Sequence, residues 1–144
     1  MRDGLADEHA LVAFRVGHTL TGPRPVSRAR IEVDASSALR GIREGGVVPG
    51  AGGLRFEVDG AAQPLPADAL VSMNLWGFRP AIFGALARAV EGFVAAGAPG
   101  EVYLPDVVAA EVDAGATVRV LVSDAPCIGV THAEDLAAVR DALA

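Results

Sequence analysis

The residues best suited to chemistry are an asparagine and the single tryptophan at the end of an apolar segment. Asn74 and Trp76 follow the run ALVSM and precede Gly77, and a strand that ends in this way often opens onto a pocket. An indole provides a flat apolar wall for a sugar or a base, and an asparagine amide offers a donor and an acceptor to hydroxyl groups. The same residues also fit a structural role, in which Trp76 belongs to the core and Asn74 caps the turn.

Two glutamates are candidates of the same kind. Glu44 and Glu101 each stand at the end of a segment, where a carboxylate can accept hydrogen bonds from sugar hydroxyls. Each of them also fits the role of a solvated surface charge.

Other common catalytic patterns are missing from the sequence, which has no GxGxxG, GxxxxGK[ST], HExxH, CxxC or GxSxG motif. His9, His18 and His132 are far apart and have no second ligand at helical or hairpin spacing, so we expect no metal site from them.

Cys127 lies near Asp124 and His132, and we interpret it as a small apolar residue beside the last strand. All twelve basic residues are arginines, which excludes Schiff-base chemistry and a P-loop lysine within this chain.

The composition predicts one globular domain over residues 1–144. The chain is 51% hydrophobic and 21% charged, unlike a disordered protein. A net charge of -6 argues against nucleic acid as a partner. One cysteine, a polar and acidic N-terminus, and no apolar run near the roughly 20 residues of a membrane span predict a cytoplasmic protein without a membrane partner.

The elements that must position the candidate residues follow from hydrophobic periodicity and turn residues. Strands are predicted at 10–16, 26–34, 39–44, 54–58, 69–78 and 117–123, and helices at 80–96, from Pro105 to Gly115 and at 133–143. We expect the first three strands to form a meander and the segment 45–53, with five glycines and one proline, to be a mobile loop. Strands separated by helices indicate an α/β or mixed α+β fold.

The helix at 80–96 is the clearest of these elements. Pro80 suits its first turn, and Gly97 and Pro99 end it. Its apolar residues recur at helical spacing and predict one stripe that faces the core, made of Ile82, Phe83, Leu86, Val90, Phe93 and Val94.

The order of three segments resembles a known enzyme family. The stretches VSMNLWGFRPAIFGAL, EVYLPDVV and VRVLVSDAPCIGVTHAEDLAAV are similar to the C-terminal half of one branch of the sugar-1-phosphate nucleotidyltransferases, or NDP-sugar pyrophosphorylases. In that branch the corresponding pieces read S-M-N-x-W-G-F, E-F-Y-x-P and G-V-T-x-x-E-D. Upstream, ALVAFRVGHTL, VSRARIEVD and LRGIRE resemble the family's central strands. The resemblance implies a Rossmann-like α/β fold that lacks its N-terminal half and has a mixed, mostly parallel sheet flanked by helices.

The resemblance also implies a function. The family transfers a nucleotidyl group from a nucleoside triphosphate to a sugar-1-phosphate, with Mg²⁺ whose ligands lie mostly in the N-terminal half. That half also holds the glycine-rich loop for the nucleotide phosphates. We therefore expect a truncated or split enzyme that is inactive alone and is completed by a partner chain. The alternative is a non-catalytic interaction module, or a gene fragment, that associates with a partner or with itself.

Carried over residue by residue, the resemblance assigns Glu44, Asn74, Trp76 and Glu101 to the sugar-side pocket. The sequence also departs from the family. The basic residue that commonly follows the glutamate is replaced by Gly45 and Gly46, and a metal-binding aspartate of many members aligns with Gly129. We expect Asp135, at the start of the last helix, to face away from the site.

Overall fold

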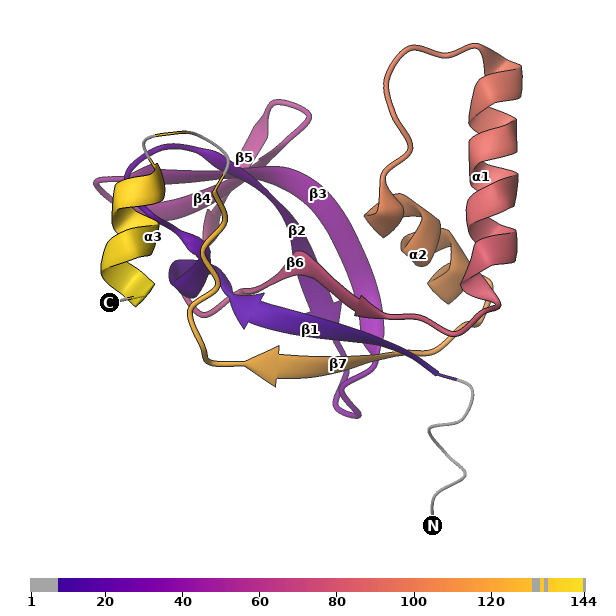
Figure 1. Ribbon diagram of the computed structural model, residues 1–144, viewed down its shortest axis with the longest axis horizontal. Coiled ribbons are helices and arrows are strands. Elements are labelled where there is room, and N and C mark those ends of the chain that lie inside the picture. The colour runs from indigo at the N-terminus through magenta and orange to yellow at the C-terminus, as the bar shows by residue number, and fades with distance from the viewer. Residues whose placement is uncertain (1–7, 131–132, 134, 144) are drawn as a thin grey trace.

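The computed structural model describes residues 8–130, 133 and 135–143. Within this part, seven strands form one mixed sheet flanked by helices (Figure 1). The strands are β1 (His9–Arg15), β2 (Val26–Val33), β3 (Leu39–Gly50), β4 (Gly53–Val58), β5 (Ala61–Leu65), β6 (Leu70–Gly77) and β7 (Val118–Ser123). The helices are α1 (Ile82–Ala96), α2 (Leu104–Asp113) and α3 (Asp135–Leu143), with a short 3-10 helix, η1 (Val16–Thr19). No helix in the described ranges is long and apolar enough to cross a membrane.

The sheet is mostly antiparallel, so the expected mostly parallel sheet is wrong. Its strand order is β5-β4-β3-β2-β6-β1-β7, and the parallel pairing among these strands is that of β1 with β7. Short turns join β2 to β5 in series, and a short turn can connect only antiparallel neighbours. Strand β7 follows two helices, and this longer connection lets it run parallel to β1.

Strand β6 lies between β1 and β2, which corrects the expected meander of the first three strands. The meander consists of β2, β3, β4 and β5 instead. Strand β6 returns from β5 and pairs with β1 on one side and with β2 on the other.

The glycine-rich segment 45–53 is not the predicted loop. Strand β3 continues through it to Gly50, and only a two-residue turn separates it from β4. Val47 is fully buried and pairs with β2 and β4. Pairing with β2 ends at Val47, so Pro49 lies where that ladder has already stopped.

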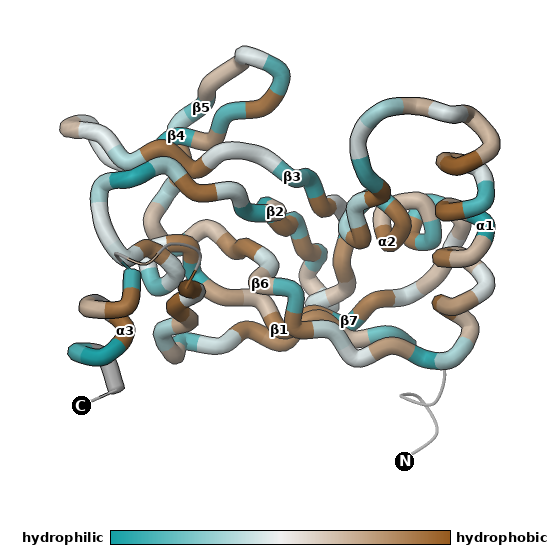
Figure 2. The backbone as a smooth tube through the Cα atoms, turned by 45° about the horizontal axis from the view of Figure 1, so that its top comes forward, coloured by the Kyte–Doolittle hydropathy of each residue, from teal (hydrophilic) through white to brown (hydrophobic). Residues whose placement is uncertain are grey.

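The main core lies between the sheet and α2. Leu11 and Ala13 of β1, Val118 of β7 and Val108 of α2 are buried together. The sheet curves around this core so far that the N–H of Val120 donates to the carbonyl of Ser37 in the β2–β3 turn, at 2.8 Å. Figure 2 shows hydrophobic segments along β1 and β7, where this core is built.

Helix α1 forms as predicted, but the predicted buried stripe is mostly wrong. Ile82 and Ala85 are buried and pack with Val107 of α2. Phe83 and Val94 are 70% and 71% exposed. The helix rests on α2 beside one end of the sheet and does not lie across the sheet, so a narrow face suffices to hold it (Figure 1).

Candidate functional site

The site begins at an irregularity in β6. Along β1, Val12 pairs with Leu75 and the next residue, Ala13, pairs with Ser72, so two extra residues of β6 bulge out. Asn74 lies in this bulge with a left-handed φ of 59°, and its N–H donates to the Oγ of the buried Ser72 at 3.0 Å. Bulges re-aim side chains next to functional sites. Here the bulge directs Asn74 away from the regular ladder.

A small cavity of about 130 Å³ lies beside the bulge. Glu44 of β3 and Asn74 of β6 both line it, together with Ser27 and Arg28 of β2. The Ser27 hydroxyl donates to Oε1 of Glu44 at 2.5 Å. The structure therefore brings two of the predicted site residues together, although they are 30 positions apart in the sequence.

Trp76 supports Asn74 and is not among the residues that line this cavity. Its Nε1 donates to Oδ1 of Asn74 at 3.4 Å. Its ring stacks on Phe78, with centroids 5.2 Å apart and planes 12° apart, and packs against the main core. One aromatic face is thus already covered. With Oδ1 engaged by the indole, the amide NH₂ group of Asn74 remains available as a donor.

Glu101 is exposed and lies just before α2. It accepts a hydrogen bond from the hydroxyl of Tyr103, which raises the pKa of that phenol, and the charge of Glu44 adds to the same effect. Tyr103 therefore lies near both glutamates and stays a neutral donor at physiological pH. The sequence analysis missed Tyr103, although it stands within the EVYLP stretch that carries the resemblance.

Arg28 is the second residue that the sequence analysis missed. Its Nε donates to Oγ1 of Thr19 at 3.2 Å, and its two terminal nitrogens donate to the carbonyls of Thr19 and Ser27 at 2.8 and 2.7 Å. Burial lowers the pKa of this guanidinium, while Cys127 and Glu44 act against the lowering. An arginine remains charged in either case. The alternation of β2 predicted only that this residue lies on one face of a strand.

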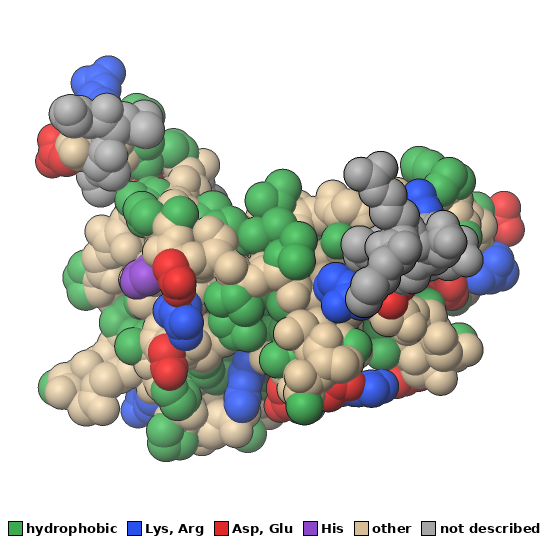
Figure 3. Space-filling view, turned by 90° about the horizontal axis from the view of Figure 1, so that it is seen from below, with side chains coloured by type: hydrophobic (Ala, Val, Ile, Leu, Met, Phe, Trp, Pro, Cys, Tyr) green, Lys and Arg blue, Asp and Glu red, His purple; other side chains and the backbone are tan. Residues whose placement is uncertain are grey.

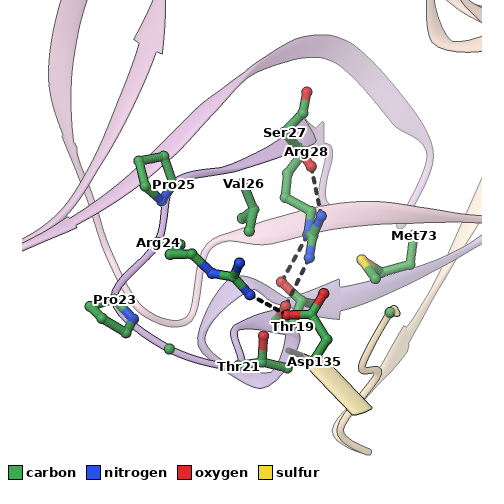
Figure 4. A pocket seen from close by; sticks show the side chains of 12 residues that line it. Thr19, Thr21, Pro23, Arg24, Pro25, Val26, Ser27, Arg28, Met73 and Asp135 are labelled. Atoms are coloured by element: carbon green, nitrogen blue, oxygen red, sulfur yellow. Dashed lines mark hydrogen bonds and ion pairs between the residues drawn. The ribbon is translucent and has the colours of Figure 1, made fainter. Parts of the chain in front are cut away.

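A larger cavity of about 420 Å³ adjoins the small one, and Ser27, Arg28 and Met73 line both (Figure 4). Arg24, in the turn before β2, and Asp135, at the start of α3, also line it. They form an ion pair at 2.5 Å, and the Asp135 side chain is only 8% exposed. The expectation that Asp135 faces away is therefore wrong, because this ion pair holds it inward.

No protein-family model and no curated protein matches the sequence. The site geometry must therefore carry the functional argument together with the sequence resemblance.

The polar groups of the two cavities suit an anion and hydroxyl groups better than a metal. The described residues contain no cluster of three or more histidine, cysteine or acidic side chains that could hold a metal ion. Arginines and hydroxyls dominate the larger cavity, whereas Mg²⁺ prefers carboxylate and carbonyl oxygens. The residues present thus do not fit the Mg²⁺ that the resemblance implies.

His9, His18 and Cys127 are not among the described residues that line the two cavities. His9 is buried, and its Nδ1 accepts a hydrogen bond from the N–H of Arg79 at 3.0 Å. His18 is exposed, and its carbonyl accepts from the N–H of the half-buried Cys127. His132 lies outside the described residues.

Proposed function

We propose that this chain binds a sugar-1-phosphate and forms the sugar-phosphate part of an enzyme related to the nucleotidyltransferases that it resembles. The observation that carries the proposal is the convergence of Glu44 and Asn74 on one cavity. The resemblance assigns both residues to a sugar pocket, and they come from two different strands, with Asn74 in the bulge of β6.

The chemistry of the small cavity suits a polyhydroxylated ring. Glu44 offers carboxylate oxygens to sugar hydroxyls, and Asn74 offers its NH₂ group. Tyr103 is not among the residues that line the cavity, but its hydroxyl bonds to Glu101 and the charge of Glu44 acts on it. Hydrogen bonds that involve a charged group are about twice as strong as neutral ones, so Glu44 is expected to contribute most to binding.

In nucleotidyl transfer, catalysis depends on positioning the reactants and on neutralising charge. Within the proposal, this chain positions the sugar phosphate. The sequence contains no glycine-rich phosphate loop, so nucleotide and metal binding are assigned to a partner chain, and the isolated chain is proposed to be inactive.

Calorimetric titration tests the binding function. A panel of hexose 1-phosphates is titrated into the protein, into Glu44→Gln and Asn74→Ala variants, and into a Glu91→Gln control, which changes an exposed carboxylate on α1. We expect one or more of the sugar phosphates to bind, with affinity roughly tenfold lower in Glu44→Gln and unchanged in the control. Absence of heat with every sugar phosphate contradicts the proposal.

A second candidate function, an interaction module, has one observation in its favour. Val12 pairs with Leu75 on one side and with Leu121 on the other, so three apolar side chains form a row across β6, β1 and β7. Leu75 and Leu121 are each 52% exposed. Figure 3 shows hydrophobic side chains grouped near the middle of one face. Such a row is typical of a surface that another chain covers.

A further inference from the structure

We propose that the larger cavity is a binding site for a phosphate group, held by Arg28 and by Arg24, and that the bound phosphate displaces the carboxylate of Asp135. The inference deepens the proposed function, because it rests on that function for the sugar end of the ligand. The anion chemistry is argued from the residues of the larger cavity alone.

Arg28 carries a positive charge and donates its hydrogen bonds to neutral groups. Its three hydrogen-bond acceptors are two carbonyl oxygens and one hydroxyl. No carboxylate of the described residues lies within ion-pair distance of this guanidinium, although the charge of Glu44 acts on it from farther away. A half-buried charge that no carboxylate contacts directly is costly. A guanidinium has five N–H donors, so two of them remain for an anion after the three observed hydrogen bonds.

These hydrogen bonds also fix the Arg28 guanidinium in place. Thr19 holds it from η1 and the backbone of Ser27 holds it from β2. Thr19 is itself buried, and its hydroxyl donates to the carbonyl of Val16 at 2.9 Å. An anion that binds here therefore meets a preorganised donor and loses little side-chain entropy of the protein.

An acidic group already occupies part of the cavity. The Asp135 carboxylate reaches in from α3 and pairs with Arg24. Figure 4 shows the guanidinium groups of Arg24 and Arg28 pointing toward the same space near Thr19 and Asp135. A phosphate dianion carries more charge and more acceptor oxygens than one carboxylate, so it can accept hydrogen bonds from both arginines.

The size of the cavity indicates a phosphate ester. A volume of about 420 Å³ lies within the range of small-molecule sites and leaves room for an organic group beside the phosphate. Because Ser27, Arg28 and Met73 line both cavities, a phosphate on Arg28 places the attached ring toward Glu44 and Asn74. The same chemistry also fits a free phosphate ion, and titration distinguishes a free phosphate ion from the phosphate group of an ester.

The test is a titration of the whole chain with inorganic phosphate, a hexose 1-phosphate and the unphosphorylated hexose. The variants are Arg28→Gln and Asp135→Asn. The control is Arg43→Gln, which removes an exposed arginine from the neighbouring strand β3. We expect Arg28→Gln to weaken binding of both phosphate compounds by roughly tenfold or more and to weaken hexose binding far less. We expect Asp135→Asn to strengthen phosphate binding several-fold, and Arg43→Gln to have no effect.

Circular dichroism checks that each variant is folded, and Arg28→Lys replaces Arg28→Gln in the titration if the latter does not fold. The lysine variant keeps the positive charge but loses the planar guanidinium with its paired N–H donors, so phosphate binding is expected to weaken but not to vanish. Sugar-phosphate binding that depends on Glu44 but not on Arg28 overturns this inference and leaves the proposed function standing. Arg28-dependent binding of inorganic phosphate, with no gain from the hexose, supports the inference and contradicts the proposed function. Absence of any phosphate binding overturns the inference.

Discussion

Gly45 illustrates how one residue can separate this chain from the family that it resembles. A Cβ atom at this position would lie 2.6 Å from Cζ of Phe56 and 2.7 Å from Cγ2 of Val58. Phe56 is buried in a core cluster with Val47. The position after Glu44 therefore cannot carry the basic side chain that the resemblance implies unless the side chains of Phe56 and Val58 shift.

We expect Gly45→Ala to destabilise the fold by about 1–3 kcal/mol, as overpacking does in other cores. Urea denaturation measures the effect. Gly92→Ala is the control, because nothing lies within 4 Å of its added Cβ on α1, and alanine favours a helix by about 1 kcal/mol over glycine. A Gly45→Ala variant as stable as the wild type would contradict the close packing of Phe56.

Asp34 holds the β2–β3 turn through its carboxylate. The Ser36 hydroxyl and the N–H groups of Ser36 and Ala38 donate to Oδ1 at 2.7, 2.8 and 3.0 Å, and Nε of Arg40 donates to Oδ2 at 2.7 Å. These bonds, that from the Ser36 side chain first, hold the pKa of Asp34 far below its usual range. Stability from this group is therefore present above the ordinary pKa of an unfolded aspartate, about 4, and is lost as the pH falls toward the folded pKa.

We expect Asp34→Asn to lower the midpoint of urea unfolding at pH 7, and the difference from the wild type to shrink at pH 3. Asp59→Asn is a matched control in another turn, where the carboxylate pairs only with the exposed Arg43 among the described contacts. An equal difference at both pH values would show that the charge of Asp34 does not stabilise the turn.

At the residue scale, the sequence predicted the site in part. The resemblance marked Glu44 and Asn74, and the structure places both of them on one cavity. Arg28 and Tyr103 were missed because the sequence around each of them does not show whether its side chain is held by hydrogen bonds within the protein or is free in solvent. The orientation of Asp135 depends on Arg24, 111 positions away, and no local pattern contains that contact.

Helix α1 shows what hydrophobic periodicity reports at the scale of an element. The period predicted the helix and its end at Gly97, which adopts a left-handed φ of 59°. It did not predict which apolar residues are buried, because that depends on how α2 packs. Similarly, the glycines of β3 were interpreted as a loop, because their role in admitting Phe56 depends on a neighbouring strand.

Two substitutions on α1 test its observed packing. Ile82 is 1% exposed, and we expect Ile82→Ala to destabilise by about 2–5 kcal/mol. Phe83, the next residue, is 70% exposed, and Phe83→Ala is expected to change stability by less than about 0.5 kcal/mol. Thermal and urea unfolding compare the two variants. Similar losses in both would indicate that the helix buries the wider stripe that its sequence predicts.

At the scale of the whole molecule, the helices leave part of the sheet uncovered. Helix α2 covers the face of β1 and β7 that carries Leu11 and Val120. The other face carries the row of Leu75, Val12 and Leu121. Antiparallel sheets commonly leave one face to solvent, but that face is then polar, whereas this one carries an apolar row. This part of the molecule is therefore the strongest structural reason to expect a partner chain.

We expect the chain to self-associate at high concentration through this row when no partner is present. Light scattering after size-exclusion chromatography compares the wild type with a Leu75→Gln, Leu121→Gln double variant, which we expect to be monomeric. Both side chains are half exposed, so the double variant should keep its stability. Val94→Gln on α1 is the control, since Val94 is the more exposed residue, at 71%, but lies away from the row. If Val94→Gln abolishes association and the double variant does not, then α1 is the contact surface. If the wild type stays monomeric at every concentration, the row does not drive self-association.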